Sequence, residues 1–125
     1  NIRVMRFVPQ MDVLSRASVF VTHGGMNSAN EGLWHGVPMA IVPQRGDQFL
    51  VARRLAELGA GIAMAPADVT AARLRDAVER LIAEASFRDR AVALGASLVA
   101  AGGAARAADE ILEAVGRRAR LSGCA

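Results

Sequence analysis

Short apolar runs alternate along the chain with longer segments in which apolar and polar residues recur at helical spacing. The apolar runs predict four strands, over residues 2–8, 18–22, 39–42 and 61–64. Within these runs apolar and polar residues do not alternate clearly, which indicates strands that are buried on both faces of a sheet.

The segments between the strands predict helices, because their apolar residues fall three or four positions apart. Helices are expected over residues 26–34, 47–58, 71–85, 87–100 and 105–118, with no more than a helical turn at 13–15. Gly36 and Gly59 are placed to end two of these helices, and Thr70 is placed to cap a third. The apolar faces comprise Leu50, Val51, Leu55, Leu58, Leu74, Val78, Leu81 and Ile82, with a further stripe at Ile111, Leu112 and Val115.

Strands that alternate with helices over short links predict the α/β class, with a Rossmann-like parallel sheet flanked by helices. The 125 residues are enough for one domain with one core. Parallel sheets of this kind bind ligands in the crevice at the carboxyl ends of their strands. The residues that directly follow the predicted strands are therefore the first place to look for a site.

The charge map argues against nucleic-acid binding despite a sequence pI near 10.9. Residues 1–116 carry twelve Arg and twelve acidic residues, and the surplus of three Arg lies in the tail. None of the five aromatic residues sits among the arginines, where a base-stacking platform would need one. The single cysteine, Cys124, cannot form an internal disulfide or a cysteine metal site. We expect no metal, no membrane span and, by default, a cytoplasmic protein cut from a longer chain.

A glycine pair stands between the second predicted strand and the helix that follows it. The residues that we expect to bind a diphosphate here are His23, Gly24, Gly25, Met26, Asn27 and Ser28. Two glycines let the backbone approach a ligand closely, and a helix N-terminus offers unpaired N–H groups and the positive end of a dipole. The same stretch also fits an ordinary turn in which Asn27 or Ser28 caps the helix.

Two further groups of polar residues follow the same logic. Glu31 lies one turn after Ser28, where a carboxylate can accept hydrogen bonds from both ribose hydroxyls. Asp47 and Gln48 follow the third predicted strand, and an adjacent carboxylate and amide suit the vicinal hydroxyls of a sugar. The alternatives are a solvated or capping Glu31 and an Asp47 that is a plain N-cap.

A third group lies at the end of the first predicted strand and just after it. Phe7 can stack on a nucleobase, the backbone around Val8 can read a base edge, and Gln10 can hydrogen-bond nearby. Taken alone, Phe7 fits the hydrophobic core equally well.

Together these residues resemble the donor-binding signature of family 1 inverting glycosyltransferases with the GT-B fold, in particular bacterial macrolide-type and natural-product enzymes. The matching pieces are Phe7-Val8-Pro9-Gln10, Thr22-His23-Gly24-Gly25-Met26-Asn27-Ser28, Glu31-Gly32-Leu33, His35-Gly36-Val37-Pro38-Met39, and Pro43-Gln44 before Gly46-Asp47-Gln48. Phe7 stands where plant members carry Trp, which leaves open the choice between uridine and thymidine nucleotides. Trp34, His35 and Pro38 fit the pattern as structural residues.

The resemblance implies a partial C-terminal domain of a GT-B enzyme, with a nucleotide-sugar-binding domain over residues 1–118 and a tail over 119–125. His23, Gly25, Asn27 and Ser28 would then hold the diphosphate, Glu31 the ribose, and Asp47 with Gln48 the donor sugar. The implied reaction transfers a hexose to a small-molecule hydroxyl with inversion, without a metal or a cofactor beyond the nucleotide-sugar co-substrate.

The resemblance places no catalytic residue in this chain, because the general base of the family lies in an N-terminal acceptor domain. The expected partners are therefore the donor and that missing domain, with self-association through an exposed sheet or helix face. Two alternatives remain on the same fold: a non-catalytic interaction module with a degenerate donor site, and a nucleotide-sugar epimerase-like GT-B domain.

Overall fold

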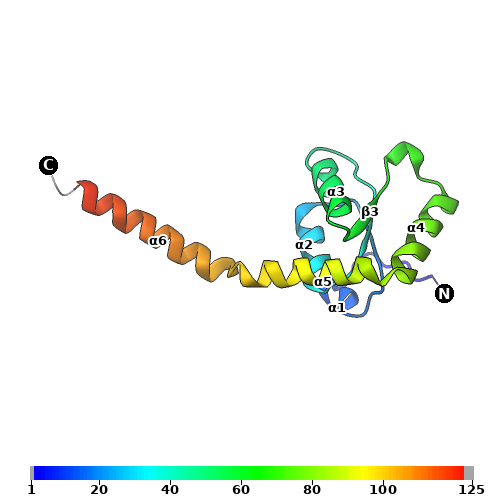
Figure 1. Ribbon diagram of the computed structural model, residues 1–125, viewed down its shortest axis with the longest axis horizontal. Helices are drawn as coiled ribbons and strands as arrows, with labels where there is room; N and C mark the ends of the chain where they lie inside the picture. Colours follow the sequence, from blue (N-terminus) through cyan, green and yellow to red (C-terminus); the bar gives the residue numbers. More distant parts are fainter. Residues whose placement is uncertain (1, 123–125) are drawn as a thin grey trace.

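A computed structural model describes residues 2–122 of the chain, with side chains described up to residue 115. The elements in chain order are α1 Gln10–Leu14, β1 Phe20–Thr22, α2 Met26–Trp34, β2 Met39–Ile41, α3 Gln48–Glu57, β3 Gly61–Ala63, the 3-10 turn η1 Pro66–Asp68, α4 Ala71–Ala83, α5 Ala85–Ala100 and α6 Gly103–Ser122. Figure 1 shows the strands and α1 to α5 gathered in one body, from which α6 projects.

Three short parallel strands form the centre of this body, in the order β1-β2-β3. Phe20 lies opposite Met39, and Met39 lies opposite Gly61, so the carboxyl ends of all three strands reach the same edge. β2 is covered on both faces, and its Met39, Ala40 and Ile41 are each 0% exposed. The α/β class and the parallel sheet are confirmed.

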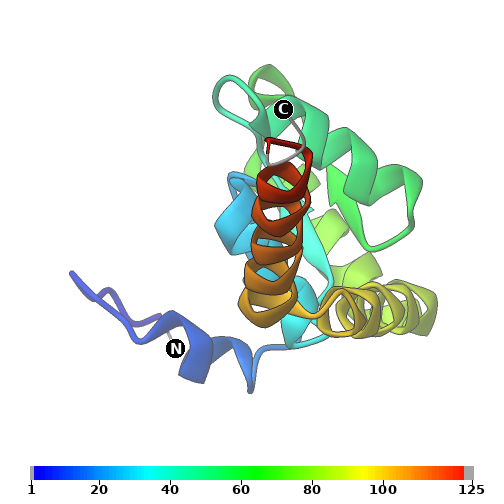
Figure 2. The same ribbon diagram turned by 90° about the vertical axis from the view of Figure 1, so that its left-hand side faces the viewer.

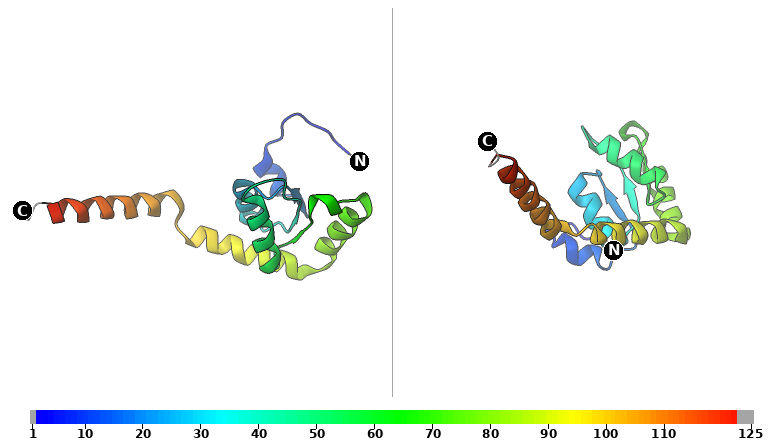
Figure 3. Two further views of the ribbon diagram at one scale, coloured as in Figure 1. Left: turned by 90° about the horizontal axis from the view of Figure 1, so that it is seen from above. Right: turned by 60° about the vertical axis from the view of Figure 1, so that its left-hand side comes forward.

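Helices cover both faces of the sheet. α2 and α3 each link a strand to its next parallel neighbour in the sheet. Because such connections are right-handed as a rule, both helices are expected on one face. α4 contacts β2 and β3 from the other face, where its Ala77 and Leu81 are buried. Figures 2 and 3 show α5 running along the base of the body beside α2, with α6 leaving it. The core of the domain therefore lies between the sheet and these helices.

The close approach of α5 to α2 depends on a missing side chain. A Cβ at Gly95 would lie 2.1 Å from the carbonyl oxygen of Leu33, so a larger residue would push the helices apart. Gly36 ends α2 as expected, with a φ of +62° that favours glycine. Together these glycines fix where α2 stops and how α5 crosses it.

The prediction of a first strand, over residues 2–8, is wrong. Residues 2–8 form no strand in the structure, and Ile2 and Val4 are 88% and 93% exposed. A strand is held by backbone hydrogen bonds to a neighbour, and within the described residues β1 is bonded only to β2. The segment therefore has strand-like sequence but no partner strand.

The helix predictions are confirmed, with small shifts at the ends, but their apolar faces are only partly covered. Val51, Leu55 and Leu81 are buried, whereas Leu50 and Ile82 are each 60% exposed. The stripe on α6 is also exposed, at 63% for Ile111, 70% for Leu112 and 62% for Val115. Residues 123–125, including Cys124, lie outside the described part of the chain.

Within the described residues, one helical stretch, Ala85–Val115, is long and apolar enough to cross a membrane by length and composition alone, with a mean hydropathy of 1.4 over an 18-residue window. Gly102 and Gly103 have φ values of +83° and +52°, and they turn the chain between α5 and α6. α5 alone has 16 residues, fewer than the ~20 that a span needs. Its Ala91 and Gly95 are buried, which ties α5 to the body.

Candidate functional site

The loops that follow β1 and β2 meet at the carboxyl edge of the sheet. Gly24 has a φ of +78°, and a Cβ there would lie 2.6 Å from Cγ2 of Ile41 and 3.7 Å from the backbone oxygen of Gln48. The glycine loop therefore packs directly on the end of β2 and the start of α3. This contact brings the first turns of α2 and α3 to the same edge of the sheet. The polar residues around His23 and those at Asp47 and Gln48 therefore lie near each other.

The first turn of α2 is open toward this edge. Gly25 is its N-cap, in an extended conformation with φ −61° and ψ 143°, and no side chain caps the helix. Asn27 and Ser28 lie inside the helix, so the alternative that one of them is an ordinary N-cap is wrong. The backbone N–H groups at this end remain for an outside acceptor.

His23 lies over this same helix end. A Cβ at Gly25 would lie 2.6 Å from Nε2 of His23, which shows that the imidazole covers the glycine. Thr22 stabilises the turn, because its buried hydroxyl accepts a hydrogen bond of 3.3 Å from the backbone N–H of Gly24. Imidazole, helix N–H groups and the helix dipole therefore converge on one point, which is the arrangement that an anion requires.

In the first turn of α3, some polar groups bond to the preceding loop and others remain exposed to solvent. Oε1 of Gln48 accepts hydrogen bonds from the backbone N–H groups of Gln44 at 2.8 Å and Arg45 at 3.1 Å. Asp47 occupies the N-cap position, but its side chain makes no capping bond, so it is not a plain N-cap. The exposed Asp47 carboxylate and Nε2 of Gln48, which donates to no described residue, are the groups left for a ligand.

Sequence reasoning missed the role of Gln44 in this loop. Its side-chain Nε2 donates to the carbonyl of Val42 at 2.9 Å, while its backbone N–H donates to Gln48. Gly46, with a φ of +57°, lets the chain turn into α3. The available signal was the pair of amides, Gln44 and Gln48, on either side of Gly46, since an amide side chain can both donate to and accept from turn backbone.

Glu31 is linked to the first residue of α1. Nε2 of Gln10 donates to Oε2 of Glu31 at 2.5 Å, across 21 residues of sequence. Glu31 is half-buried on α2, one turn beyond Ser28. The structure thus joins one residue expected near the base to the residue expected at the ribose.

The remaining expected residues lie at the surface or in structural positions. Phe7 is 82% exposed and Val8 39%, so the alternative that Phe7 belongs to the core is wrong. Pro38 is fully buried, and Trp34 is 56% exposed. His35 is the C-cap of α2, and its buried Nε2 has no hydrogen-bond partner among the described residues.

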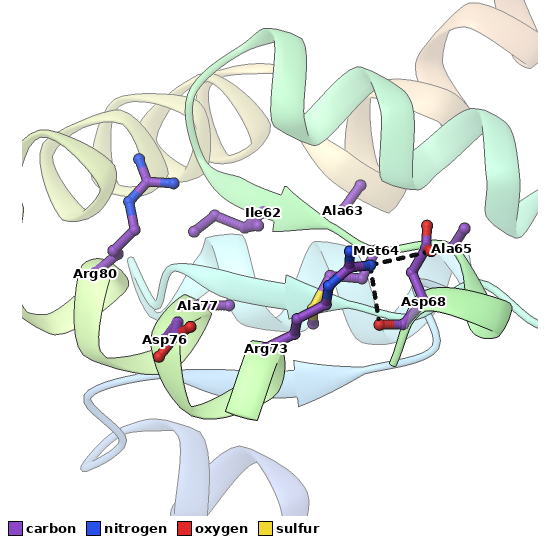
Figure 4. A pocket seen from close by; sticks show the side chains of 9 residues that line it. All are labelled: Ile62, Ala63, Met64, Ala65, Asp68, Arg73, Asp76, Ala77 and Arg80. Carbon is purple, nitrogen blue, oxygen red and sulfur yellow. Dashed lines mark hydrogen bonds and ion pairs between the residues drawn. The ribbon is translucent and has the colours of Figure 1, made fainter. Parts of the chain in front are cut away.

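A cavity of 300 Å³ lies away from these loops, between β3, η1 and α4. Figure 4 shows Arg73 turned toward Asp68, to which it is bound at 3.0 Å. The paired charges account for much of this polar lining, and none of the expected site residues contributes to it. No group of three or more potential metal ligands occurs within residues 2–122.

The chain is similar to known proteins along most of its length. The family model for the erythromycin biosynthesis protein CIII-like C-terminal domain matches residues 1–114. An uncharacterized UDP-glucosyltransferase, YojK, of Bacillus subtilis strain 168 is 44% identical over 115 residues, which cover 92% of this chain and 28% of that protein.

Solved structures give the same result. The glycotransferase of kitacinnamycin is 45% identical, with a TM-score of 0.82 over 87% of this chain and 28% of its own. The glycosyltransferase VinC, in complex with DTDP, is 41% identical, with a TM-score of 0.69 over 71% of this chain and 23% of its own. The chain thus spans 28% or less of the length of these proteins. Because the family model covers residues 1–114, the chain belongs to the erythromycin biosynthesis protein CIII-like C-terminal domains of the family 1 glycosyltransferases, and its fold is part of the GT-B fold.

Proposed function

We propose that this chain binds a nucleoside-diphosphate sugar as the donor-binding part of a glycosyltransferase. The observation that carries the proposal is the packing of Gly24 against Ile41 and the backbone of Gln48. It sets the open helix end beside His23 close to Asp47 and Gln48, so that one molecule can bridge them. A diphosphate with a sugar attached has this combination of charge and hydroxyl groups.

The diphosphate is assigned to the start of α2. Backbone N–H groups at Met26, Asn27 and Ser28 have no capping side chain, and His23 adds a donor above Gly25. Charge grows on the diphosphate as it leaves the sugar, so these donors stabilise the transition state more than the bound donor. No step of this binding requires a metal.

The sugar and the nucleoside are assigned to residues on either side of this diphosphate site. Asp47 accepts from hexose hydroxyls, and Nε2 of Gln48 donates to them, because Oε1 of Gln48 is already used by the loop. Glu31 accepts from the ribose. Phe7, with 82% of its surface exposed, stacks on the base beside the backbone of Val8.

The transfer itself is proposed to invert the anomeric carbon and to deliver a hexose to a small-molecule hydroxyl. The acceptor hydroxyl needs a general base. Neither histidine of this chain suits that role: His23 is assigned to phosphate, and His35 ends α2 with its Nε2 buried. The base is therefore proposed to belong to an N-terminal acceptor domain, and the 125-residue chain alone is expected to bind donor without turnover.

Calorimetry with UDP and dTDP tests the proposal on the folded chain. We expect saturable binding of at least one of the two nucleotides, because the phosphate contacts are common to both. VinC, 41% identical to this chain, was solved in complex with DTDP, which supports including the thymidine nucleotide.

The alternatives predict other results. No binding at millimolar nucleotide by a chain with a cooperative melting transition would favour a non-catalytic interaction module. If the parent enzyme epimerised the sugar of a donor supplied without acceptor, an epimerase-like domain would be favoured instead.

A further inference from the structure

A single hydrogen bond joins the two ends of the proposed nucleoside site. Gln10, the first residue of α1, donates from Nε2 to Oε2 of Glu31 in the middle of α2, at 2.5 Å. Gln10 comes three residues after Phe7, and Glu31 three residues after Ser28. The bond therefore connects the segment assigned to the base with the helix assigned to the phosphates.

The attachment of α1 to the body does not depend on this bond. Leu14, at the other end of α1, is 2% exposed and already anchors the helix. The backbone of α1 is tied locally, since the N–H of Val13 donates to the carbonyl of Pro9 at 3.1 Å. A polar side-chain link at the half-buried start of α1 adds little to this packing, so a role in orienting Glu31 explains it better.

Glu31 keeps most of its hydrogen-bonding capacity after this bond is made. Two carboxylate oxygens offer about four acceptor positions. Within the described residues, Gln10 is the donor to Glu31, and no arginine forms an ion pair with it. One neutral amide fixes the rotation of the carboxylate without neutralising its charge, and Oε1 stays available for a ligand hydroxyl.

We propose that Gln10 is a positioning residue, which holds the Glu31 carboxylate in the orientation that accepts the ribose hydroxyls. This inference rests on the proposed nucleotide-binding function and deepens it. Gln10 then acts on the nucleotide through Glu31 and not through a contact of its own with the base. Its effect is confined to the ribose hydroxyls, and it sets how strongly the site prefers a ribose to a sugar that lacks them.

The test is a double-mutant cycle read with two probes, UDP and 2′,3′-dideoxy-UDP, by calorimetry on the whole chain. We expect the parent chain to bind UDP about tenfold more tightly than the dideoxy analogue, as lost hydrogen bonds to a carboxylate imply. Glu31→Ala should abolish this preference. Gln10→Ala should reduce it to about threefold or less, while the affinity for dideoxy-UDP stays unchanged.

The double variant Gln10→Ala/Glu31→Ala separates indirect from direct action. If Gln10 acts through Glu31, the double variant should bind UDP no more weakly than Glu31→Ala alone. Additive losses would show that Gln10 touches the nucleotide itself and would overturn the proposal. So would a Gln10→Ala variant that kept the full preference for UDP.

Two further variants guard against a structural explanation. Gln10→Glu/Glu31→Gln exchanges donor and acceptor, so it should retain the link and the melting temperature of the parent while losing the preference for ribose. A double variant that kept this preference would contradict the need for a carboxylate on α2. Asn30→Ala, an exposed change next to Glu31 on the same helix, is the matched control and should leave both affinities unchanged.

The failure of this inference is distinguishable from failure of the proposed function. A parent chain that binds neither probe would contradict nucleotide binding itself, and the inference with it. A parent chain that binds both probes equally would leave nucleotide binding intact and contradict only the role of the Glu31–Gln10 pair.

Discussion

At the scale of single residues, the proposed site assigns the diphosphate and the sugar hydroxyls to different side chains. His23 lies over Gly25 at the open end of α2, whereas Asp47 stands uncapped at the start of α3. In the proposed function, a phosphate interacts with His23 and the start of α2, and a sugar hydroxyl interacts with Asp47. Because the two groups are on different helices, changes to them should affect different parts of the donor.

His23→Ala and Asp47→Ala are expected to have separable effects. Loss of a donor to a charged phosphate should weaken binding of both UDP and UDP-glucose about tenfold or more. Loss of the Asp47 carboxylate should leave UDP affinity within about twofold and remove any additional affinity for UDP-glucose. Calorimetry with both ligands measures this. Equal loss of UDP binding in both variants would contradict the division of roles.

At the scale of elements, the loop between β2 and α3 is organised by one amide. Oε1 of Gln48 accepts hydrogen bonds from two backbone N–H groups, those of Gln44 and Arg45, and its Nε2 has no partner among the described residues. The residue assigned to donor recognition is therefore also the residue that shapes the loop. A simple alanine substitution would mix these two effects.

Gln48→Glu and Gln48→Ala form a matched pair that separates them. Glutamate keeps acceptor oxygens for the two N–H groups but has no donor, so stability should be unchanged while sugar binding weakens. Alanine loses both, and the free energy of unfolding should fall by ~1 kcal/mol. For a chain of 125 residues, that is about 4 °C in melting temperature. Equal melting temperatures for both variants would show that the loop does not depend on the Gln48 acceptor.

The sequence was a good guide to helices and a poor one to the first strand. α2 is found over the expected residues 26–34, because its apolar spacing and its glycine boundaries point to the same ends. Residues 2–8 have equally strong strand character, yet strand pairing depends on a neighbour that a local pattern cannot supply. Local chemistry thus predicted elements, but not which of them would pair.

The site was predictable in composition but not in contacts. The positions of His23, Asp47 and Gln48 after strands placed them at one edge of the sheet. No spacing rule could show that Oε1 of Gln48 is used by the loop, or that Gln10 reaches Glu31 across 21 residues. These bonds depend on how side chains meet once the backbone is folded.

At the scale of the whole molecule, the proposed site and the C-terminal helix are separate. α6 projects from the body beyond the turn at Gly102 and Gly103, and its Ile111, Leu112 and Val115 are exposed (Figures 1 and 3). Most helical stability in proteins comes from packing of an apolar face, so the exposed stripe of this 20-residue helix favours contact with another surface. We expect this stripe to promote self-association of the chain.

Deletion of residues 103–125 should therefore reduce self-association without affecting the site. The body keeps its sheet and α1 to α5, so the dissociation constant for UDP should change by about twofold or less. Sedimentation velocity at several concentrations should show the parent chain associating and the shortened chain remaining monomeric. If the shortened chain associated like the parent, α6 would not be the interface. Association would then be assigned to the exposed segment 2–8, where Ile2 and Val4 offer another uncovered apolar surface. That segment leads into Gln10, which is hydrogen-bonded to Glu31. Association through residues 2–8 should therefore be sensitive to bound nucleotide, whereas association through α6 should not.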